Sequence, residues 1–121
     1  MKVIYDNKVK ALGDAVDEFA DANMFIIFGD GAPPELRDYC YLVDVNPING
    51  EINPGQYLVI GKEEFLITAV GSEAPVTLKG LGHMTINMTG KEEAELPGTL
   101  YTEYADVPYI DVGTAIRIIE K

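Results

Sequence analysis

The sequence has one cysteine, one histidine, no tryptophan and few cations. A single cysteine, Cys40, cannot form an internal disulfide, which argues against a disulfide-stabilised secreted scaffold. Cys40 lies between two tyrosines in an apolar segment, so we expect a buried, unreactive thiol. Nine Lys and Arg against 20 Asp and Glu give a formal net charge of −11. Binding a nucleic acid or an anionic lipid surface needs clustered cations, so this shortage argues against both functions.

Long hydrophobic runs are also missing. The longest aliphatic and aromatic run is Met24–Phe28, whereas a membrane-spanning helix needs about 20 apolar residues. The N-terminal segment meets a charge at Asp6, too early for the apolar region of a signal peptide. We therefore expect a cytoplasmic protein without direct membrane insertion.

Short apolar segments separated by Gly and Pro dominate what is present. Hydrophobic residues make up 47% of the chain, enough to bury the core of one domain spanning residues 1–121. The segments that read as strands are Lys2–Lys10, Met24–Phe28, Tyr39–Val45, Tyr57–Ile60, Glu64–Val70, His83–Met88, Gly98–Tyr104 and Thr114–Glu120. About seven or eight short strands with frequent turns predict an all-β fold, a small closed or partly closed β-barrel.

One segment has the period of a helix. Its apolar residues follow the i, i+3, i+4, i+7, i+8 spacing of an amphipathic helix: Leu12, Ala15, Val16, Phe19 and Ala20. Asp14 is the best candidate for the N-cap. The sequence therefore predicts one short amphipathic helix that covers an end or a side of the barrel, because a single short helix cannot bury its apolar stripe alone.

The sequence lacks the residues that most known metal, nucleotide and catalytic sites require. One His and one Cys, without CxxC or HxxxH spacing, do not make a metal site. There is no GxGxxG or phosphate-binding loop. Ser72 is the only serine, and no Ser-His-Asp arrangement can be picked out. We therefore expect neither a metal nor a cofactor.

His83 is the most informative polar residue. It opens a strictly alternating segment. Met84 and the apolar residues at every second position after it face the core, while His83 and Thr85 share the opposite, polar face. One interpretation is a solvated or hydrogen-bonded strand histidine. The other is a nucleophile that accepts a phosphoryl group, because neutral imidazole has a free lone pair. Backbone N–H groups at Gly80 and Gly82 and the Thr85 hydroxyl would then stabilise the phosphoryl oxygens.

Blocks of the sequence resemble a known family along nearly the entire chain. The blocks are Val3-Ile4-Tyr5, Gly31-Ala32-Pro33 with Leu36 and Tyr39-Cys40, Ile67-Thr68-Ala69-Val70-Gly71-Ser72, Leu81-Gly82-His83-Met84-Thr85, and Gly90 with Glu93-Ala94-Glu95-Leu96-Pro97-Gly98-Thr99. In this order and spacing they are similar to the glucitol/sorbitol-specific enzyme IIA component of the bacterial phosphoenolpyruvate-dependent sugar phosphotransferase system.

The resemblance implies that the domain is a phosphoryl carrier in sugar transport. Its histidine would accept phosphate from the phosphocarrier protein HPr and pass it to the sorbitol/glucitol-specific IIB component, while the IIC membrane permease imports the sugar. The resemblance also implies a small β-barrel. On this basis we expect His83 to be the phosphohistidine.

The sequence departs from the family at one position. The histidine usually assigned as phosphorylated corresponds to Val43, which cannot accept phosphate. The neighbouring Asp44 offers an acyl phosphate, and His83 matches another histidine of the family. The alternative function is a non-catalytic regulatory or binding homologue. An unrelated small-molecule-binding barrel is a third reading.

Overall fold

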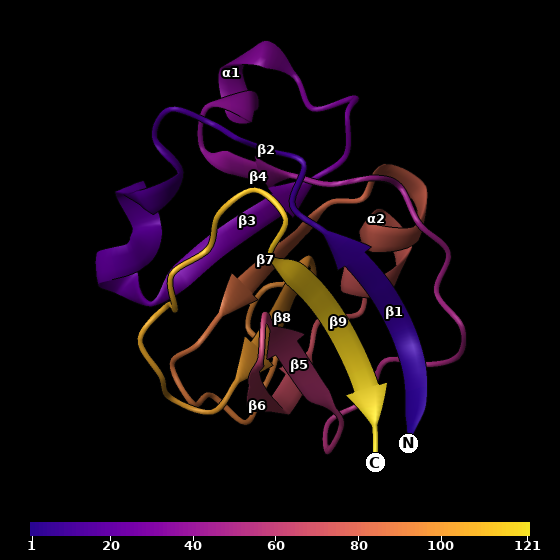
Figure 1. The fold of residues 1–121 in the computed structure, drawn as a ribbon. Helices are drawn as coiled ribbons and strands as arrows, with labels where there is room; N and C mark the ends of the chain where they lie inside the picture. The colour runs from indigo at the N-terminus through magenta and orange to yellow at the C-terminus, as the bar shows by residue number, and fades with distance from the viewer.

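The computed structural model describes residues 1–121, and its main feature is one nine-stranded sheet (Figure 1). The strands are β1 (Lys2–Lys8), β2 (Ala11–Leu12), β3 (Met24–Phe28), β4 (Cys40–Leu42), β5 (Tyr57–Ile60), β6 (Glu63–Val70), β7 (Met84–Asn87), β8 (Thr99–Thr102) and β9 (Ala115–Glu120). Their order in the sheet is β1-β9-β5-β6-β8-β7-β3-β4-β2. None of the helices has the length and apolarity needed to cross a bilayer.

The two edge strands of this sheet are consecutive in the chain. Only Val9 and Lys10 separate β1 from β2. The Val9 N–H donates to the Thr114 carbonyl beside β9 (3.0 Å), and the Lys10 N–H donates to the Leu42 carbonyl of β4 (2.7 Å). One short segment therefore bonds to both ends of the sheet and curls it into a partly closed barrel, which confirms the predicted all-β class.

The two faces of β3 pack into different clusters. Phe25 and Ile27 point into the main core, a cluster of 21 buried residues inside the barrel. Phe28 belongs to a second, smaller cluster with Cys40 and Leu42, against which Ile26 also packs. Alternation along a strand separates the two sets. The outer face of β3 and β4 is therefore apolar as well, which gives the candidate site an apolar floor.

The barrel interior is completed by the helix α2 (Ala74–Leu81), which the sequence analysis missed. Ala74 and Leu78 are fully buried and belong to the main core. Pro75 lies in the first turn, and Gly82 ends the helix with a left-handed φ of 69°. Proline near the start and glycine just past the end are a recognisable helix signature, and it was present in the sequence.

The helix predicted around residues 12–20 forms later and in another geometry. It is a 3₁₀ helix over Val16–Ala22 with no buried residue and no side-chain cap, so Asp14 is not its N-cap. The Gly13 and Ala15 N–H groups donate to the carbonyls of Cys40 (3.0 Å) and Asp38 (2.8 Å). These bonds to the segment before β4 hold residues 13–15 in a turn outside any helix, after β2 ends at Leu12. Downstream, α1 (Pro34–Arg37) supplies one further turn.

Removing the buried side chain of α2 should destabilise the barrel. We expect Leu78→Ala to lower the free energy of unfolding by about 2–5 kcal/mol, because it leaves a cavity in the main core. Val76→Ala on the same helix is the matched control, since Val76 is 61% exposed, and its effect should stay within about 0.5 kcal/mol. Equal shifts of the two urea midpoints would contradict this role of α2.

Candidate functional site

His83 lies at the junction between α2 and β7. The strand that follows alternates as the sequence predicts: Met84 and Ile86 are fully buried in the core, whereas Thr85 and Asn87 are half-buried on the other face. His83 shares that other face and is itself half-buried. The junction thus presents an imidazole on the outer side of the sheet, next to β3.

The surroundings of the imidazole are less polar than expected. Its ring packs against Phe28, with ring centroids 4.3 Å apart and planes inclined at 38°. Nδ1 of His83 is the one buried side-chain nitrogen or oxygen in the chain without a hydrogen-bond partner. Nε2 is not among the buried atoms without a partner, which leaves it as the candidate for the reacting nitrogen.

Burial also sets the charge state of the ring. Desolvation lowers the pKa of His83 from its usual 6.5, and a weaker interaction with the Ile27 backbone opposes the shift. None of the five ion pairs of the structure includes His83. The imidazole is therefore neutral at neutral pH, and one ring nitrogen carries a free lone pair.

A small apolar pocket opens beside the ring. It has a volume of about 210 Å³ and is lined by Phe19, Ile26, Leu36, Tyr39, Cys40 and His83. The 3₁₀ helix and α1 contribute its outer wall, and the Phe19 and Tyr39 rings meet there with centroids 5.8 Å apart. Cys40 is 1% exposed, and burial raises the pKa of its thiol. This agrees with the predicted unreactive cysteine.

The two glycines expected to assist His83 belong to α2 and to its C-terminal cap. Gly80 lies within α2. The N–H of Gly82 donates to the Leu78 carbonyl at 3.0 Å, and the N–H of His83 donates to the Thr77 carbonyl at 3.2 Å. These helix-capping bonds occupy the N–H groups of Gly82 and His83. Of the three residues expected to stabilise the phosphoryl group, only Thr85 has a side chain on the same face of the sheet as His83.

Two residues that the sequence analysis did not single out position His83. The hydroxyl of Thr77 donates to the His83 carbonyl at 2.7 Å, so α2 holds the backbone of the junction. Phe28 supports the ring, because Met84 pairs with Ile27 and places the preceding histidine beside Phe28. No local signal marks Phe28 as a neighbour, since the contact depends on the pairing of β3 with β7.

Val43 lies on the opposite side of the sheet from His83. It is fully buried in the main core, and its N–H donates to the Phe28 carbonyl at 2.9 Å. Neither a partner protein nor water reaches this side chain. The position that corresponds to the usual phosphohistidine is therefore a packing position in this chain.

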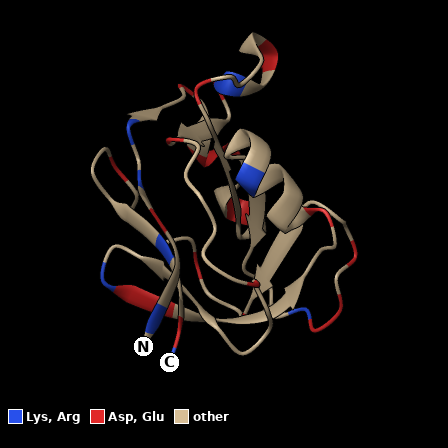
Figure 2. Cartoon of the chain, turned by 90° about the vertical axis from the view of Figure 1, so that its right-hand side faces the viewer, with Lys and Arg blue, Asp and Glu red and all other residues tan.

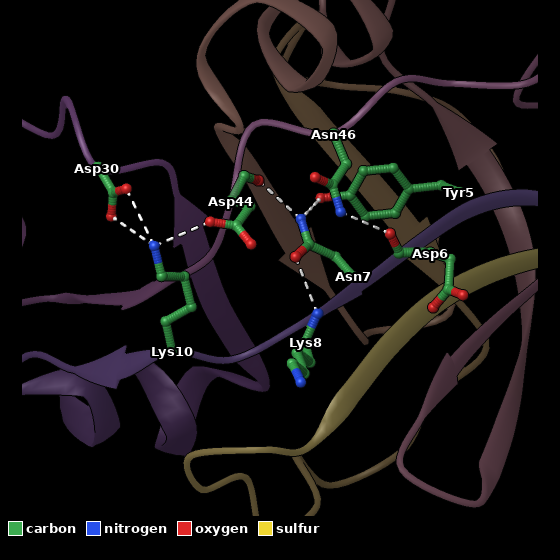
Figure 3. A network of polar contacts seen from close by, with 8 residues as sticks. All are labelled: Tyr5, Asp6, Asn7, Lys8, Lys10, Asp30, Asp44 and Asn46. Carbon is green, nitrogen blue, oxygen red and sulfur yellow. Dashed lines mark hydrogen bonds and ion pairs between the residues drawn. The ribbon is translucent and has the colours of Figure 1, made fainter.

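Asp44 is exposed and belongs to a polar network (Figure 3). Its carboxylate lies 2.9 Å from Nζ of Lys10, which also pairs with Asp30 at 3.1 Å. The two carboxylates raise the pKa of Lys10, with Asp44 the larger cause. The Asn7 amide donates to the Asp44 carbonyl at 2.7 Å and fixes the backbone. Asp44 is thus an ion-paired carboxylate at a site separate from the apolar pocket.

Protonation of His83 should reduce stability, since the folded state disfavours the charged ring. The folded pKa is lowered, so the unfolded chain binds more protons as the pH falls through 6.5. We therefore expect the stability of the wild-type chain, relative to His83→Phe, to fall from about pH 7 to about pH 5.5. Urea unfolding of both proteins at each pH measures this difference. The pH dependence that the carboxylates contribute is the same in both proteins and cancels in the difference. A difference independent of pH would show that the ring is freely solvated.

Comparisons with known proteins agree on one family. A family model for the PTS system glucitol/sorbitol-specific IIA component matches residues 4–117. The PTS system glucitol/sorbitol-specific EIIA component of Escherichia coli (strain K12) is 38% identical over 102 residues, which covers 84% of this chain and 82% of that protein. The component of the same name from Shigella flexneri is 36% identical over 101 residues, with the same coverage.

The fold has a solved counterpart. The crystal structure of the PTS system IIA component from Enterococcus faecalis V583 matches with a TM-score of 0.78 at 25% identity, and covers 93% of this chain and 97% of that chain. The family match thus spans most of the sequence, and the structural match extends over most of the fold. The chain belongs to the family of glucitol/sorbitol-specific IIA components of the sugar phosphotransferase system.

Proposed function

We propose that this IIA component is a cytoplasmic phosphoryl carrier whose acceptor is Nε2 of His83. In this proposal the phosphoryl group comes from the phosphocarrier protein HPr and passes to the sorbitol/glucitol-specific IIB component of the permease. The observation that carries the proposal is a half-buried imidazole whose pKa is lowered and whose Nδ1 is enclosed without a partner. It is the only imidazole in the chain.

The reaction needs no further reagent. The Nε2 lone pair attacks the phosphorus of the phosphohistidine on the donor, a new N–P bond forms and the N–P bond of the donor breaks. The donor imidazole leaves with the electron pair of that bond and is protonated. In the second transfer phospho-His83 is the donor: a nucleophile of the IIB component attacks the phosphorus, the N–P bond to His83 breaks, and the imidazole leaves with the electron pair of that bond. Positioning of the two rings supplies most of the catalysis in such a transfer.

Thr85 is the residue of this chain best placed to assist. It shares the outer face of β7 with His83, so its hydroxyl lies on the side from which the phosphoryl group arrives. Gly82 contributes to the site through its backbone conformation and its lack of a side chain. A side chain at this position would approach the Gly29 nitrogen to 3.0 Å, and the left-handed φ of 69° favours glycine. Gly82 therefore allows the turn that brings His83 beside Phe28.

Replacing His83 should abolish phosphorylation without unfolding the chain. His83→Phe keeps a ring against Phe28 and removes the enclosed, unpaired nitrogen, so its stability should match or exceed that of the wild type at neutral pH. Neither His83→Phe nor His83→Gln should gain a phosphoryl group from phosphoenolpyruvate, enzyme I and HPr, as read by intact mass. The group on the wild-type chain should be labile in acid and stable in alkali, as a P–N bond is.

Asp44 provides the discriminating control. An acyl phosphate on Asp44 would be labile to hydroxylamine and would survive the loss of His83. Asp44→Asn should therefore retain uptake of one phosphoryl group. If His83→Phe still takes up a phosphoryl group and His83→Phe/Asp44→Asn does not, then Asp44 is the acceptor. Absence of uptake in the wild type would favour the non-catalytic homologue.

A histidine at position 43 should not restore the reaction. Val43 is fully buried in the core, so Val43→His introduces a larger polar ring without space or partner. We expect a loss of stability of about 2–5 kcal/mol, combining overpacking with an unpaired buried nitrogen. The double variant His83→Phe/Val43→His should stay unphosphorylated at a temperature where it is folded. Recovery of uptake in this variant would show that the core position opens to partners.

A further inference from the structure

The largest cavity of the structure lies away from His83. It has a volume of about 570 Å³ and is lined by residues of the 12–20 segment on one side, by residues 107–110 on the other, and by Tyr41. Tyr41 belongs to the main core inside the barrel, whereas its neighbours in β4 belong to the small cluster on the outer face. This Tyr41 cavity is therefore on the opposite side of β4 from the His83 pocket. Its volume is within the range of about 300–1,000 Å³ that is typical of small-molecule sites.

Tyr41 carries a polar group that the chain itself does not use. The residue is 6% exposed, and its ring meets Phe25 edge-on with centroids 5.8 Å apart. Its hydroxyl forms no hydrogen bond within the chain, yet the one fully enclosed unpartnered atom is Nδ1 of His83, so the Tyr41 oxygen borders the cavity. Burial, and then the negative charge of Asp17, raise the pKa of Tyr41. The phenol oxygen therefore lies near that carboxylate.

Two carboxylates at the cavity also lack partners. Asp14 and Asp17 both line it, and neither takes part in any of the five ion pairs or caps the 3₁₀ helix. No Lys or Arg lines the cavity. This local charge adds to the net charge of −11 of the whole chain, whose excess of acidic residues is visible in Figure 2. The cavity therefore attracts cations and repels anions.

The remaining wall of the cavity is apolar and fixed in place. Seven of the 11 lining residues are hydrophobic. The loop that carries residues 107–110 is fastened at both ends. The Asn23 amide, at the end of the 3₁₀ helix, donates to the Ala105 carbonyl at 2.7 Å, and the Gly113 N–H donates to the Val9 carbonyl at 2.8 Å. The cavity is thus formed before any ligand arrives, with polar groups on one side and apolar groups on the other.

We propose that the Tyr41 cavity binds a small organic cation, a primary ammonium group on an apolar body. The three N–H donors of an ammonium match the carboxylates of Asp14 and Asp17 and the hydroxyl of Tyr41. The apolar body lies against the hydrophobic wall and releases water from it. A neutral polyol would pair with the hydroxyl but would leave both negative charges uncompensated. This inference goes beyond phosphoryl transfer and does not depend on His83.

The first test compares two probes of the same shape. Phenethylamine is a cation at neutral pH, and phenethyl alcohol is its neutral analogue. NMR titration of the whole chain with each probe gives the Kd and the location of binding. We expect the amine to bind about fivefold more tightly than the alcohol, because only the amine pairs with the carboxylates. The backbone amide signals of Val16, Val107 and Ile110 should shift, and that of Thr85 on the outer face should not. Equal affinities, shifts confined to other residues, or no binding at millimolar amine would overturn the proposal.

Matched charge variants assign the binding to this cavity. Asp14→Asn/Asp17→Asn and Glu18→Gln/Asp21→Asn each remove two negative charges from the same part of the chain, but only the first pair lines the cavity. We expect the first pair to raise the Kd of phenethylamine about fivefold, and the second to change it by less than about twofold. Equal effects of the two pairs would show attraction to the net charge alone and would overturn the site.

Tyr41→Phe separates the hydroxyl from the ring. It keeps the ring against Phe25 and removes a hydroxyl that has no partner in the chain, so the urea midpoint should not fall. The Kd of phenethylamine should rise about threefold or more, because one hydrogen bond to the ammonium is lost. A folded Tyr41→Phe with an unchanged Kd would overturn the proposal. Amine binding is read without any phosphoryl donor, so its outcome is independent of whether His83 accepts phosphate.

Discussion

The register between β3 and β7 decides what each side of this sheet does. Met84 lies opposite Ile27 and Ile86 opposite Phe25, so four apolar side chains meet inside the barrel. The same register places His83 beside Phe28 on the outer face. A slip of one residue would exchange the two faces and bury the histidine in the core. Core packing and the chemistry of the site thus depend on one antiparallel ladder.

Stability and reactivity conflict at His83. An apolar floor of Phe28 and its neighbours removes water from the imidazole and leaves Nδ1 without a partner. This costs free energy, since buried polar groups are normally hydrogen-bonded. The same surroundings keep the ring neutral, which preserves its lone pair at the pH of the cell. The α2 cap and the Thr77 hydroxyl hold the backbone of the junction in place against this cost.

Local patterns in the sequence predict the strands well and the helices poorly. The alternation of β7 and the apolar run of β3 have clear periods, and both lie where the sequence places them. The segment before the 3₁₀ helix has helical spacing, but hydrogen bonds to residues 38–40 hold it outside a helix, and no local pattern reveals those bonds. Gly82 resembles a turn signal and is instead the cap of α2. The pocket could not be predicted, because it depends on contacts between segments distant in sequence.

Closure of the barrel by a single N-terminal segment has a consequence for folding. β1 pairs with β9, so Lys2 lies beside Glu120 and the two ends of the chain meet (Figure 1). β1 therefore leaves the ribosome well before β9, which is its neighbour in the sheet. Contacts of such large sequence separation slow folding, because loop closure has to precede them. Until β9 is made, the apolar side chains of β1 have no sheet to join, and the nascent chain exposes them to water.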